Sequence, residues 1–158
     1  MSNDGTADRT STDGPLRILV GVDGSEESLT ALRTAAAMQR GMGGRLRVVT
    51  SWAYPAVPAD GYVPPSVDFS EAAEEVQRTA LLTALGEEAA AGADTAIVYG
   101  GAAHVLIEES KNADILVLGS RGLGGFSGLL LGSVSRACAE HAHCDVLVAR
   151  GTTEFRGT

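Results

Sequence analysis

The segment from residue 114 to 135, DILVLGSRGLGGFSGLLLGSVS, contains the residues best suited to hold an anion. Gly119, Gly122 and Gly132, followed by Ser133, form the spacing Gly-x2-Gly-x9-Gly-Ser. Because glycine lacks a Cβ, backbone N–H groups can approach a phosphate closely. A helix that begins at Ser133 adds unpaired N–H groups and the positive end of its dipole. The pattern therefore predicts a phosphate-cradling loop between a strand and a helix.

Polar side chains near this loop could complete an anion site. Arg121 is the only cation in the loop and can pair with phosphate, and Ser133 and Ser135 offer hydroxyl donors. Asp23 repels bare phosphate but suits a ribose hydroxyl, an adenine amino group or a metal-bound water. Structural alternatives stay open: a tight turn for the glycines, an Asx-turn or helix cap for Asp23, and a solvated loop cation for Arg121.

Motifs of fast nucleotide-using enzymes are missing from the sequence. There is no G-x-x-x-x-G-K-[ST] loop, and the one lysine, Lys111, is far from the glycine loop. The first strand–helix turn lacks G-x-G-x-x-G, and no Ser-His-Asp or Cys-His pattern stands out. The spacing of Cys138, His141, His143 and Cys144 is irregular for zinc. We therefore expect no catalytic residue and no metal ligand from these groups.

Composition limits the class of protein further. The chain has 158 residues, 44% of them apolar, which fits one globular domain. A net charge of −8 disfavours nonspecific binding to nucleic acid or anionic membranes. No apolar run approaches the roughly 18 to 20 residues of a membrane span, and no secretory signal is visible. Two cysteines do not form a disulfide framework, so we expect a cytoplasmic protein. We expect residues 1–14 and 151–158 to be tails of a single domain, 15–150.

Five apolar runs predict strands. Their near-continuous apolar character is typical of parallel strands buried on both faces. The runs are Arg17–Val22, Leu46–Trp52, Thr95–Tyr99, Ile115–Gly119 and Asp145–Ala149.

Helical patterns separate the strands. Ser25 is the expected N-cap of a helix over Glu26–Arg40 that Gly41 stops, and Asp68 with Glu71 precedes a long helix to about Ala91. Two shorter helices are expected over Ala102–Ser110 and Ser133–Ala142. This order predicts an α/β fold, an open parallel sheet with helices on both faces.

In such sheets ligands bind beyond the carboxyl ends of the strands, where the strand order reverses. Asp23 and the glycine loop follow the first and fourth predicted strands, so they share one crevice if these strands are neighbours. The stretch Tyr54–Val67 carries four of the five prolines and is too long for an ordinary connector. It is expected to be either a lid over the site or an excursion from the domain.

The glycine spacing resembles the nucleotide-binding signature of the universal stress protein family. RILVGVDGSEES resembles the family's opening strand, aspartate and helix start; LRVVTSWAYP resembles its second strand and loop; HCDVLVAR resembles its last strand. The resemblance covers nearly all of the expected domain. It implies a Rossmann-like, five-stranded sheet of order 3-2-1-4-5 and a homodimer formed through the last strand.

The resemblance also implies a function. Members with this signature bind ATP and act in stress adaptation, so it implies an adenine nucleotide (ATP, or AMP or ADP) with Mg²⁺ as counter-ion. We expect a regulatory protein with at most slow ATP hydrolysis and an unidentified protein partner. Two alternatives stay open: a partner-binding dimer with a vestigial pocket, and a metal-assisted nucleotide hydrolase in which Asp23 holds the metal.

Family positions carried onto this sequence give a set of binding residues. Gly21 and Asp23 would border the adenosine, and the backbone of Ser51 would meet the adenine edge, although the family often has an apolar residue there. The expected ribose and phosphate contacts are Gly119, Ser120, Arg121, Gly122, Leu123, Gly124 and Gly125. The expected contacts of the phosphate tail are Gly132, Ser133, Val134 and Ser135.

Overall fold

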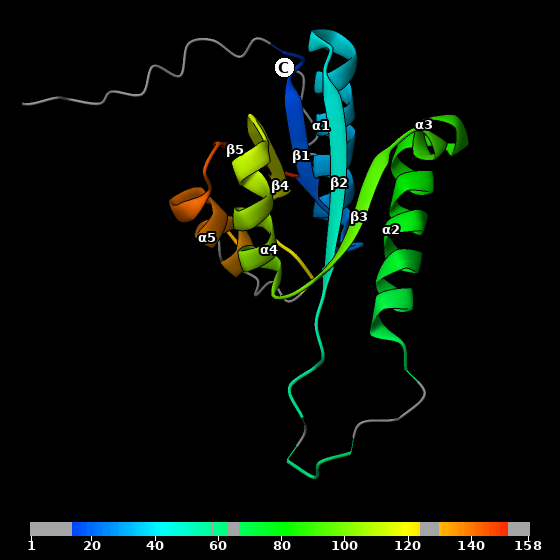
Figure 1. Ribbon diagram of the computed structural model, residues 1–158, viewed down its shortest axis with the longest axis vertical. Helices are drawn as coiled ribbons and strands as arrows, with labels where there is room; N and C mark the ends of the chain where they lie inside the picture. The colour runs from blue at the N-terminus through cyan, green and yellow to red at the C-terminus, as the bar shows by residue number, and fades with distance from the viewer. Residues whose placement is uncertain (1–13, 58, 63–66, 124–129, 152–158) are drawn as a thin grey trace, which may run out of the picture.

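Five parallel strands form one sheet of order β3-β2-β1-β4-β5 (Figure 1). The computed structural model describes residues 14–57, 59–62, 67–123 and 130–151. The strands are β1 (Arg17–Gly21), β2 (Arg45–Trp52), β3 (Asp94–Tyr99), β4 (Ile115–Gly119) and β5 (Asp145–Ala149). This confirms the predicted open parallel sheet and its order. The first and fourth strands are neighbours, with Val20 of β1 paired with Val117 of β4.

Helices cover both faces of the sheet, as predicted. They are α1 (Glu26–Met42), α2 (Phe69–Leu85), α3 (Glu87–Ala91), α4 (Ala102–Glu109) and α5 (Ser133–His141), with a 3-10 turn over Ser110–Asn112. The helices α1 and α2 pack on one face, and α4 and α5 pack on the other (Figure 1). In the described ranges, no helix is long and apolar enough to cross a bilayer.

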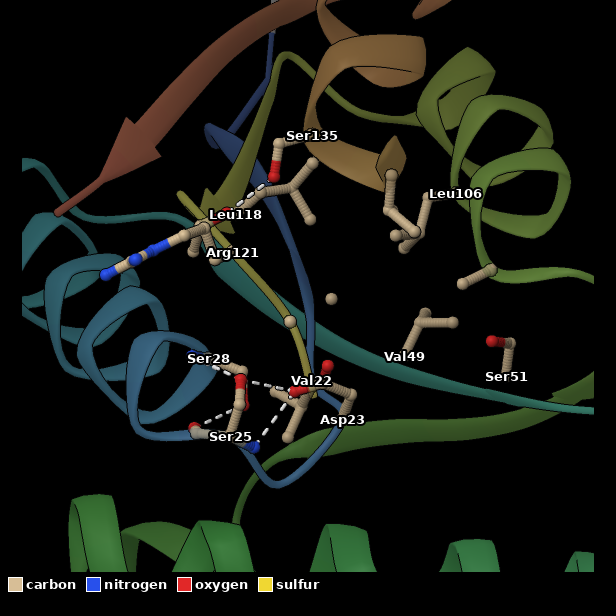
Figure 2. Close-up of a pocket in the computed structure, with 15 residues that line it drawn as sticks. Val22, Asp23, Ser25, Ser28, Val49, Ser51, Leu106, Leu118, Arg121 and Ser135 are labelled. Carbon is tan, nitrogen blue, oxygen red and sulfur yellow. Dashed lines mark hydrogen bonds between the residues drawn. The ribbon is translucent and has the colours of Figure 1, made fainter. Parts of the chain in front are cut away.

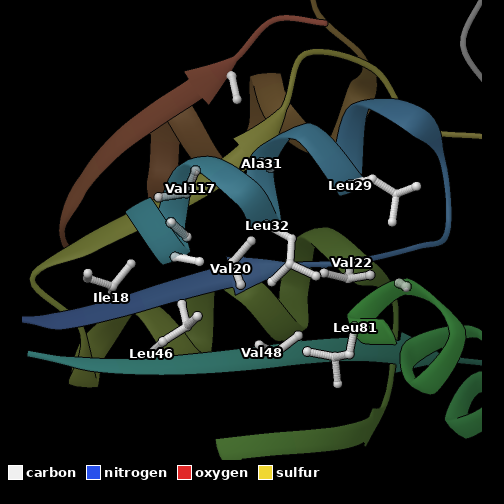
Figure 3. Packing of buried hydrophobic residues seen from close by; sticks show 14 residues of the cluster. Ile18, Val20, Val22, Leu29, Ala31, Leu32, Leu46, Val48, Leu81 and Val117 are labelled. Carbon is white, nitrogen blue, oxygen red and sulfur yellow. The ribbon is translucent and has the colours of Figure 1, made fainter. Parts of the chain in front are cut away.

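Alternate residues of the strands belong to two hydrophobic clusters, one on each face of the sheet. Ile18 and Val20 of β1 join Leu32 of α1 and Leu81 of α2 on one side of the sheet (Figure 3). Leu19, between them in the chain, joins the cluster under α4 and α5. Successive strand side chains point to opposite faces, and burying each aliphatic one contributes about 1.5–3 kcal/mol. This burial fixes α1 and α4 over the sheet, with the carboxyl ends of β1 and β4 between them.

Two predicted helices differ from the structure, one in where it ends and one in being divided. The first helix passes through Gly41 and ends at Gly43, which has φ 74° and whose N–H donates to the Gln39 carbonyl. The predicted long second helix is divided at Gly86, which has φ 83° and whose N–H donates to the Leu82 carbonyl. A glycine ends a helix where it takes a positive φ, while a glycine in a helical conformation costs only about 1 kcal/mol.

The proline-rich stretch after β2 runs away from the carboxyl edge of the sheet in its described part, residues 53–57 and 59–62 (Figure 1). The Tyr54 ring packs edge-on against Trp52, with ring centroids 5.5 Å apart, and against Phe69 at 5.9 Å. These contacts fasten the base of the stretch to β2 and to the start of α2. Most of the two predicted tails lies outside the described residues.

Candidate functional site

A cleft opens at the carboxyl edge of the sheet, where the strand order reverses between β1 and β4 (Figure 2). Its empty space is about 540 Å³ when the open, solvent-filled mouth is included. Eight of the residues predicted from sequence line it: Gly21, Asp23, Ser51, Gly119, Arg121, Gly122, Val134 and Ser135. Segments that are far apart in the chain therefore meet at one crevice.

The other predicted residues take different positions. Ser120 is buried, and its N–H donates to the Ala149 carbonyl. Leu123 is exposed, and Ser133 is exposed at the start of α5, outside the lining of the cleft. Gly132 is the N-cap of α5. The predicted residues Gly124 and Gly125 lie outside the described residues.

Sequence reasoning missed most of the apolar wall. Val22, Val49 and Leu118 line the cleft from the ends of strands, and Ala102 and Leu106 line it from α4. The strand residues could have been found, since they lie next to predicted carboxyl ends. Nothing in the sequence brings α4 to this crevice. The polar residues Ser25 and Ser28 at the start of α1 were also missed.

Neighbouring elements approach two glycines of the cleft closely, Gly21 through leucine side-chain ends and Gly119 through backbone. A Cβ on Gly21 would lie 2.8 Å from Cδ1 of Leu106 and 2.9 Å from Cδ2 of Leu118. A Cβ on Gly119 would lie 2.6 Å from the carbonyl carbon of Glu27. The end of β4 is therefore pressed against the first turn of α1, where only a glycine backbone fits.

Asp23 joins the turn after β1 to the glycine loop. Its Oδ1 accepts hydrogen bonds from the N–H of Ser25 at 2.9 Å and from its Oγ at 2.6 Å. Its Oδ2 accepts from the N–H of Leu123 at 3.2 Å. A Cβ on Gly122 would lie 2.6 Å from the same Oδ2. The Asx-turn expected as an alternative is therefore present, and the carboxylate still lines the cleft.

The N-terminus of α1 is fully complemented. Oγ of Ser25 accepts from the N–H of Ser28 at 3.2 Å, which makes Ser25 the N-cap that the sequence predicts. Glu26 and Glu27 place negative charge in the first turn. Since carboxylates already balance the positive end of this helix dipole, α1 has little attraction left for another anion.

The N-terminus of α5 is not complemented in this way. Its N-cap, Gly132, provides no side-chain hydrogen bond, and the first turn contains no acidic residue. Among the residues that the structure describes, the backbone N–H groups of Val134 and Ser135 have no acceptor. Both residues line the cleft. The cleft therefore has a helix N-terminus with unpaired donors, the arrangement that binds phosphate and other anions.

The Ser135 hydroxyl has a different role from the predicted one. Its Oγ donates to the Gly119 carbonyl at 2.6 Å and ties the start of α5 to the end of β4 (Figure 2). The hydroxyl proton is therefore used within the protein, which leaves the backbone N–H of Ser135 as its donor without an acceptor among the described residues. Ser135 is buried, so this hydrogen bond is shielded from water.

Arg121 is held at the side of the cleft. Its Nη2 lies 3.5 Å from Oε1 of Glu27, and its side chain extends toward α1 (Figure 2). The sequence predicted a cation that is free to meet phosphate. In the structure this cation is paired with a carboxylate of the neighbouring helix.

A buried polar network supports the floor of the cleft. Oγ1 of Thr50 donates to the Val22 carbonyl at 2.8 Å. Nε2 of Gln77 in α2 lies 3.2 Å from Oγ1 of Thr50, 3.2 Å from the Val48 carbonyl and 3.1 Å from the Ala96 carbonyl. This network ties α2 to β2 and β3 and fixes the backbone just before Asp23.

The cysteine and histidine residues near α5 do not form a metal site. Within the described ranges, no group of three His, Cys, Asp or Glu side chains could hold a metal ion. Cys138 is fully buried on the inner face of α5, and burial raises the pKa of its thiol to about 11. The thiol is therefore protonated and packs as a small apolar group.

Comparisons of the sequence identify relatives. The model of the universal stress protein family matches residues 16–150. A universal stress protein of Mycolicibacterium smegmatis is 33% identical over 147 residues, which are 90% of this chain and 48% of that protein. One from Mycobacterium tuberculosis is 33% identical over 138 residues, 84% of this chain and 45% of that protein. The chain thus spans about half the length of the curated relatives it matches.

Solved structures share the fold. A universal stress protein from Lactobacillus plantarum has a TM-score of 0.68 and 24% identity, covering 85% of this chain and 97% of that one. One in complex with cAMP has a TM-score of 0.64 and 27% identity, covering 87% and 99%. One from Arabidopsis thaliana with AMP bound has a TM-score of 0.58 and 17% identity, covering 91% and 97%. With the family match over residues 16–150 and the sheet order β3-β2-β1-β4-β5, these likenesses lead to one conclusion: the chain belongs to the universal stress protein family.

Proposed function

We propose that the cleft binds an adenine nucleotide, with ATP as the preferred ligand. The observation that carries this proposal is the start of α5, where Val134 and Ser135 line the cleft and their N–H groups have no acceptor among the described residues. Unpaired N–H donors at a helix N-terminus stabilise bound phosphate. The glycine loop from Gly119 to Gly122 lies beside them and lets the backbone approach the same phosphates.

The other parts of the cleft suit an adenosine. Val22, Val49 and Leu106 form an apolar wall against which an adenine ring can pack, and the Ser51 backbone meets its edge. Oδ1 of Asp23 already accepts two hydrogen bonds from Ser25, whereas Oδ2 accepts one and keeps a second lone pair. Asp23 can therefore also accept a hydrogen bond from a ribose hydroxyl.

Ligands of other family members support an adenine nucleotide. One solved universal stress protein is a complex with cAMP, one from Archaeoglobus fulgidus is a complex with dAMP, and one from Arabidopsis thaliana has AMP bound. The proposed preference for ATP goes beyond the ligands of these solved structures. It rests on the signature spacing and on the exposed position of Ser133 at the start of α5, beyond the lined cleft, where further phosphates would extend.

The proposed role is regulatory, in stress adaptation, with at most slow ATP hydrolysis. Among the described residues, Asp23 is the only carboxylate that lines the cleft, and both its oxygens already accept hydrogen bonds. Magnesium would therefore be held by the nucleotide phosphates, where it neutralises their charge. Binding, and not turnover, is the function that these residues serve. We place this role in the cytoplasm and expect it to act through a protein partner.

A homodimer through β5 is part of the proposal. The strand β5 is at one edge of the sheet, so one side of its backbone has no partner strand within the described chain. Val146, Leu147 and Val148 in this strand are only partly buried. Pairing of two such edges about a twofold axis would satisfy the backbone groups and bury these side chains. Light scattering on the purified chain tests this, and a monomer at all concentrations contradicts it.

Two measurements test the nucleotide proposal. Mass spectrometry of the gently purified protein is expected to detect a bound adenine nucleotide. Equilibrium dialysis with ATP, ADP and AMP is expected to give the tightest binding for ATP. Absence of binding for all three at millimolar concentration leaves the partner-binding dimer with a vestigial pocket as the better reading. A turnover assay with and without magnesium tests the metal-assisted hydrolase. That alternative requires that the protein hydrolyse many nucleotides per chain, and that this hydrolysis depend on magnesium.

A further inference from the structure

The glycine loop is attached to the acidic start of α1 by two contacts. The first is the ion pair between Arg121 and Glu27, with Nη2 and Oε1 3.5 Å apart. The second is the hydrogen bond from the Leu123 N–H to Oδ2 of Asp23. In both contacts the loop provides the donor and the α1 region provides the carboxylate. Two donors of the loop, the Arg121 guanidinium and the Leu123 N–H, are therefore already engaged by carboxylates of the protein.

The ion pair stands directly beside the anion site. Gly119, whose missing Cβ makes room for the Glu27 backbone, begins the loop, and Ser135 at the unpaired start of α5 is hydrogen-bonded to the same Gly119. In the part of the chain that the structure describes, Arg121 is the only positively charged residue that lines the cleft. The side chains of Arg121 and Glu27 are 41% and 24% exposed, so the pair is accessible to a competing anion in the cleft.

We propose that Glu27 is a specificity-determining residue that weakens the preference of this site for nucleotides with more phosphates, because it competes with the phosphates for Arg121. The proposal rests on the nucleotide-binding function argued above. A guanidinium pairs with phosphate in two parallel hydrogen bonds, which is favoured over a single contact at 3.5 Å. To reach a phosphate, however, Arg121 must leave Glu27, and the carboxylate left behind repels the ligand.

This competition depends on the number of phosphates. Adenosine carries no charge and has no interaction with either member of the ion pair beyond packing. AMP brings one phosphate group and ATP brings three, so the favourable contact with Arg121 and the repulsion by Glu27 both grow along this series. Removal of the Glu27 charge should therefore tighten ATP most, AMP less and adenosine not at all.

The decisive variant is Glu27→Gln, which keeps the size of the side chain and removes its charge. Its matched control is Glu26→Gln, since Glu26 precedes it in the first turn of α1 and has no ion pair among the described residues. Isothermal titration of the full chain with ATP, AMP and adenosine gives the dissociation constants. Melting temperatures of the two variants check that the fold is retained.

The expected result is about threefold to fivefold tighter binding of ATP by Glu27→Gln, with less than twofold change for AMP, since exposed ion pairs contribute up to about 1 kcal/mol, which is about fivefold in affinity. Glu26→Gln should leave the ratio of ATP to AMP affinity unchanged. In the background of Arg121→Gln there is no competition for the guanidinium, so the Glu27→Gln change should keep only the smaller gain that comes from removing the direct repulsion of the phosphates. Added salt should reduce the difference, because both charges are partly exposed.

Three outcomes contradict the inference. They are an unchanged ratio of ATP to AMP affinity in Glu27→Gln, an equal gain in Glu26→Gln, and a full gain that persists without Arg121. An equal gain of ATP affinity in Glu26→Gln would mean that the effect comes from the net charge of the protein and not from the ion pair. If the unmodified chain binds none of the ligands, the proposed function itself is wrong, so failure of the function and failure of the inference give different results.

Discussion

The backbone N–H of Leu123 donates a hydrogen bond to Oδ2 of Asp23 over 3.2 Å, although the two residues are 100 positions apart in the chain. The contact joins the turn after β1 to the loop after β4, at the one place where the order of the sheet reverses. Asp23 thereby sets the distance between the two segments that border the cleft. Gly122 lies over the same carboxylate oxygen, so the loop tolerates little added volume there.

Gly122→Val should abolish nucleotide binding while the fold survives. The new Cβ would meet Oδ2 of Asp23 at 2.6 Å, which forces the loop away from the turn after β1. We expect at least a tenfold loss of ATP affinity in equilibrium dialysis with a nearly unchanged melting temperature. The control is Gly151→Val, because nothing lies within 4 Å of a Cβ at Gly151. Unchanged affinity in Gly122→Val would count heavily against the loop assignment.

Ser133→Ala should weaken ATP binding more than AMP binding. Ser133 is exposed at the first position of α5 and lies outside the lined cleft, where the distal phosphates of ATP would reach. A hydrogen bond to a charged group contributes about 1.5–3 kcal/mol, so we expect roughly a tenfold loss for ATP. Titration with both nucleotides measures this. Equal losses for ATP and AMP place Ser133 away from the distal phosphates.

Thr50→Val should lower both stability and nucleotide affinity. The change keeps the shape of the side chain but leaves the Val22 carbonyl and the Gln77 amide without their hydroxyl partner. Loss of a buried hydrogen bond costs about 1–3 kcal/mol of the free energy of unfolding, measured by urea denaturation. ATP affinity should fall as well, because the Val22 backbone leads into Asp23.

Thr30→Val is the matched control for this change. The Thr30 hydroxyl donates to the Glu26 carbonyl within the exposed part of α1. Its loss should change the free energy of unfolding by less than about 0.5 kcal/mol. If Thr50→Val behaves like this control, the buried network does not support the cleft.

The ion pair at the start of β1 predicts a pH dependence of stability. The Arg17 side chain donates to Asp114 at 2.9 Å and 3.2 Å, and these hydrogen bonds, with one from the Arg17 N–H, lower the pKa of Asp114. A carboxyl with a lowered pKa in the folded state adds stability above its unfolded pKa of about 3.9. That stability is lost as the pH falls through the lower, folded pKa.

Asp114→Asn should therefore reduce the free energy of unfolding by about 1 kcal/mol at pH 7, since half-exposed Arg17 is screened by water. The difference from the unmodified chain should shrink as the pH is lowered below about 4. Urea denaturation from pH 3 to pH 7 measures it. Asp145→Asn at the start of β5 is the control, with an expected change within about 0.5 kcal/mol. A difference that is constant across this range contradicts the assignment.

The sequence alone determined the class of fold and most of the strand limits. The runs Ile115–Gly119 and Asp145–Ala149 were predicted with the limits that the structure has, and the other three strands differ by one residue at one end. Such limits follow from local patterns, because apolar β-branched residues between turn residues favour buried strands wherever they occur. The spacing of glycines and the caps at Ser25 and Asp68 are local in the same sense.

Helix ends were less predictable, because they depend on which glycine takes a positive φ. Gly41, Gly43 and Gly86 are the same residue type, and a sequence does not say which of them takes a positive φ. Tertiary packing decides it, because the helix continues for as long as its buried face has a partner. The aromatic contacts of Tyr54 depend in the same way on where the chain leaves the sheet.

Only the tertiary structure decided which residues of the site contact one another. It placed Leu106 of α4 in the wall of the cleft, turned the Ser135 hydroxyl to the Gly119 carbonyl, and paired Arg121 with Glu27. Each contact joins residues from elements that are separate in the chain. Their distances follow from the packing of helices on the sheet, and packing is a property of the whole fold. The sequence supplied the donors and the charges, and the fold determined which of them remain available to a ligand.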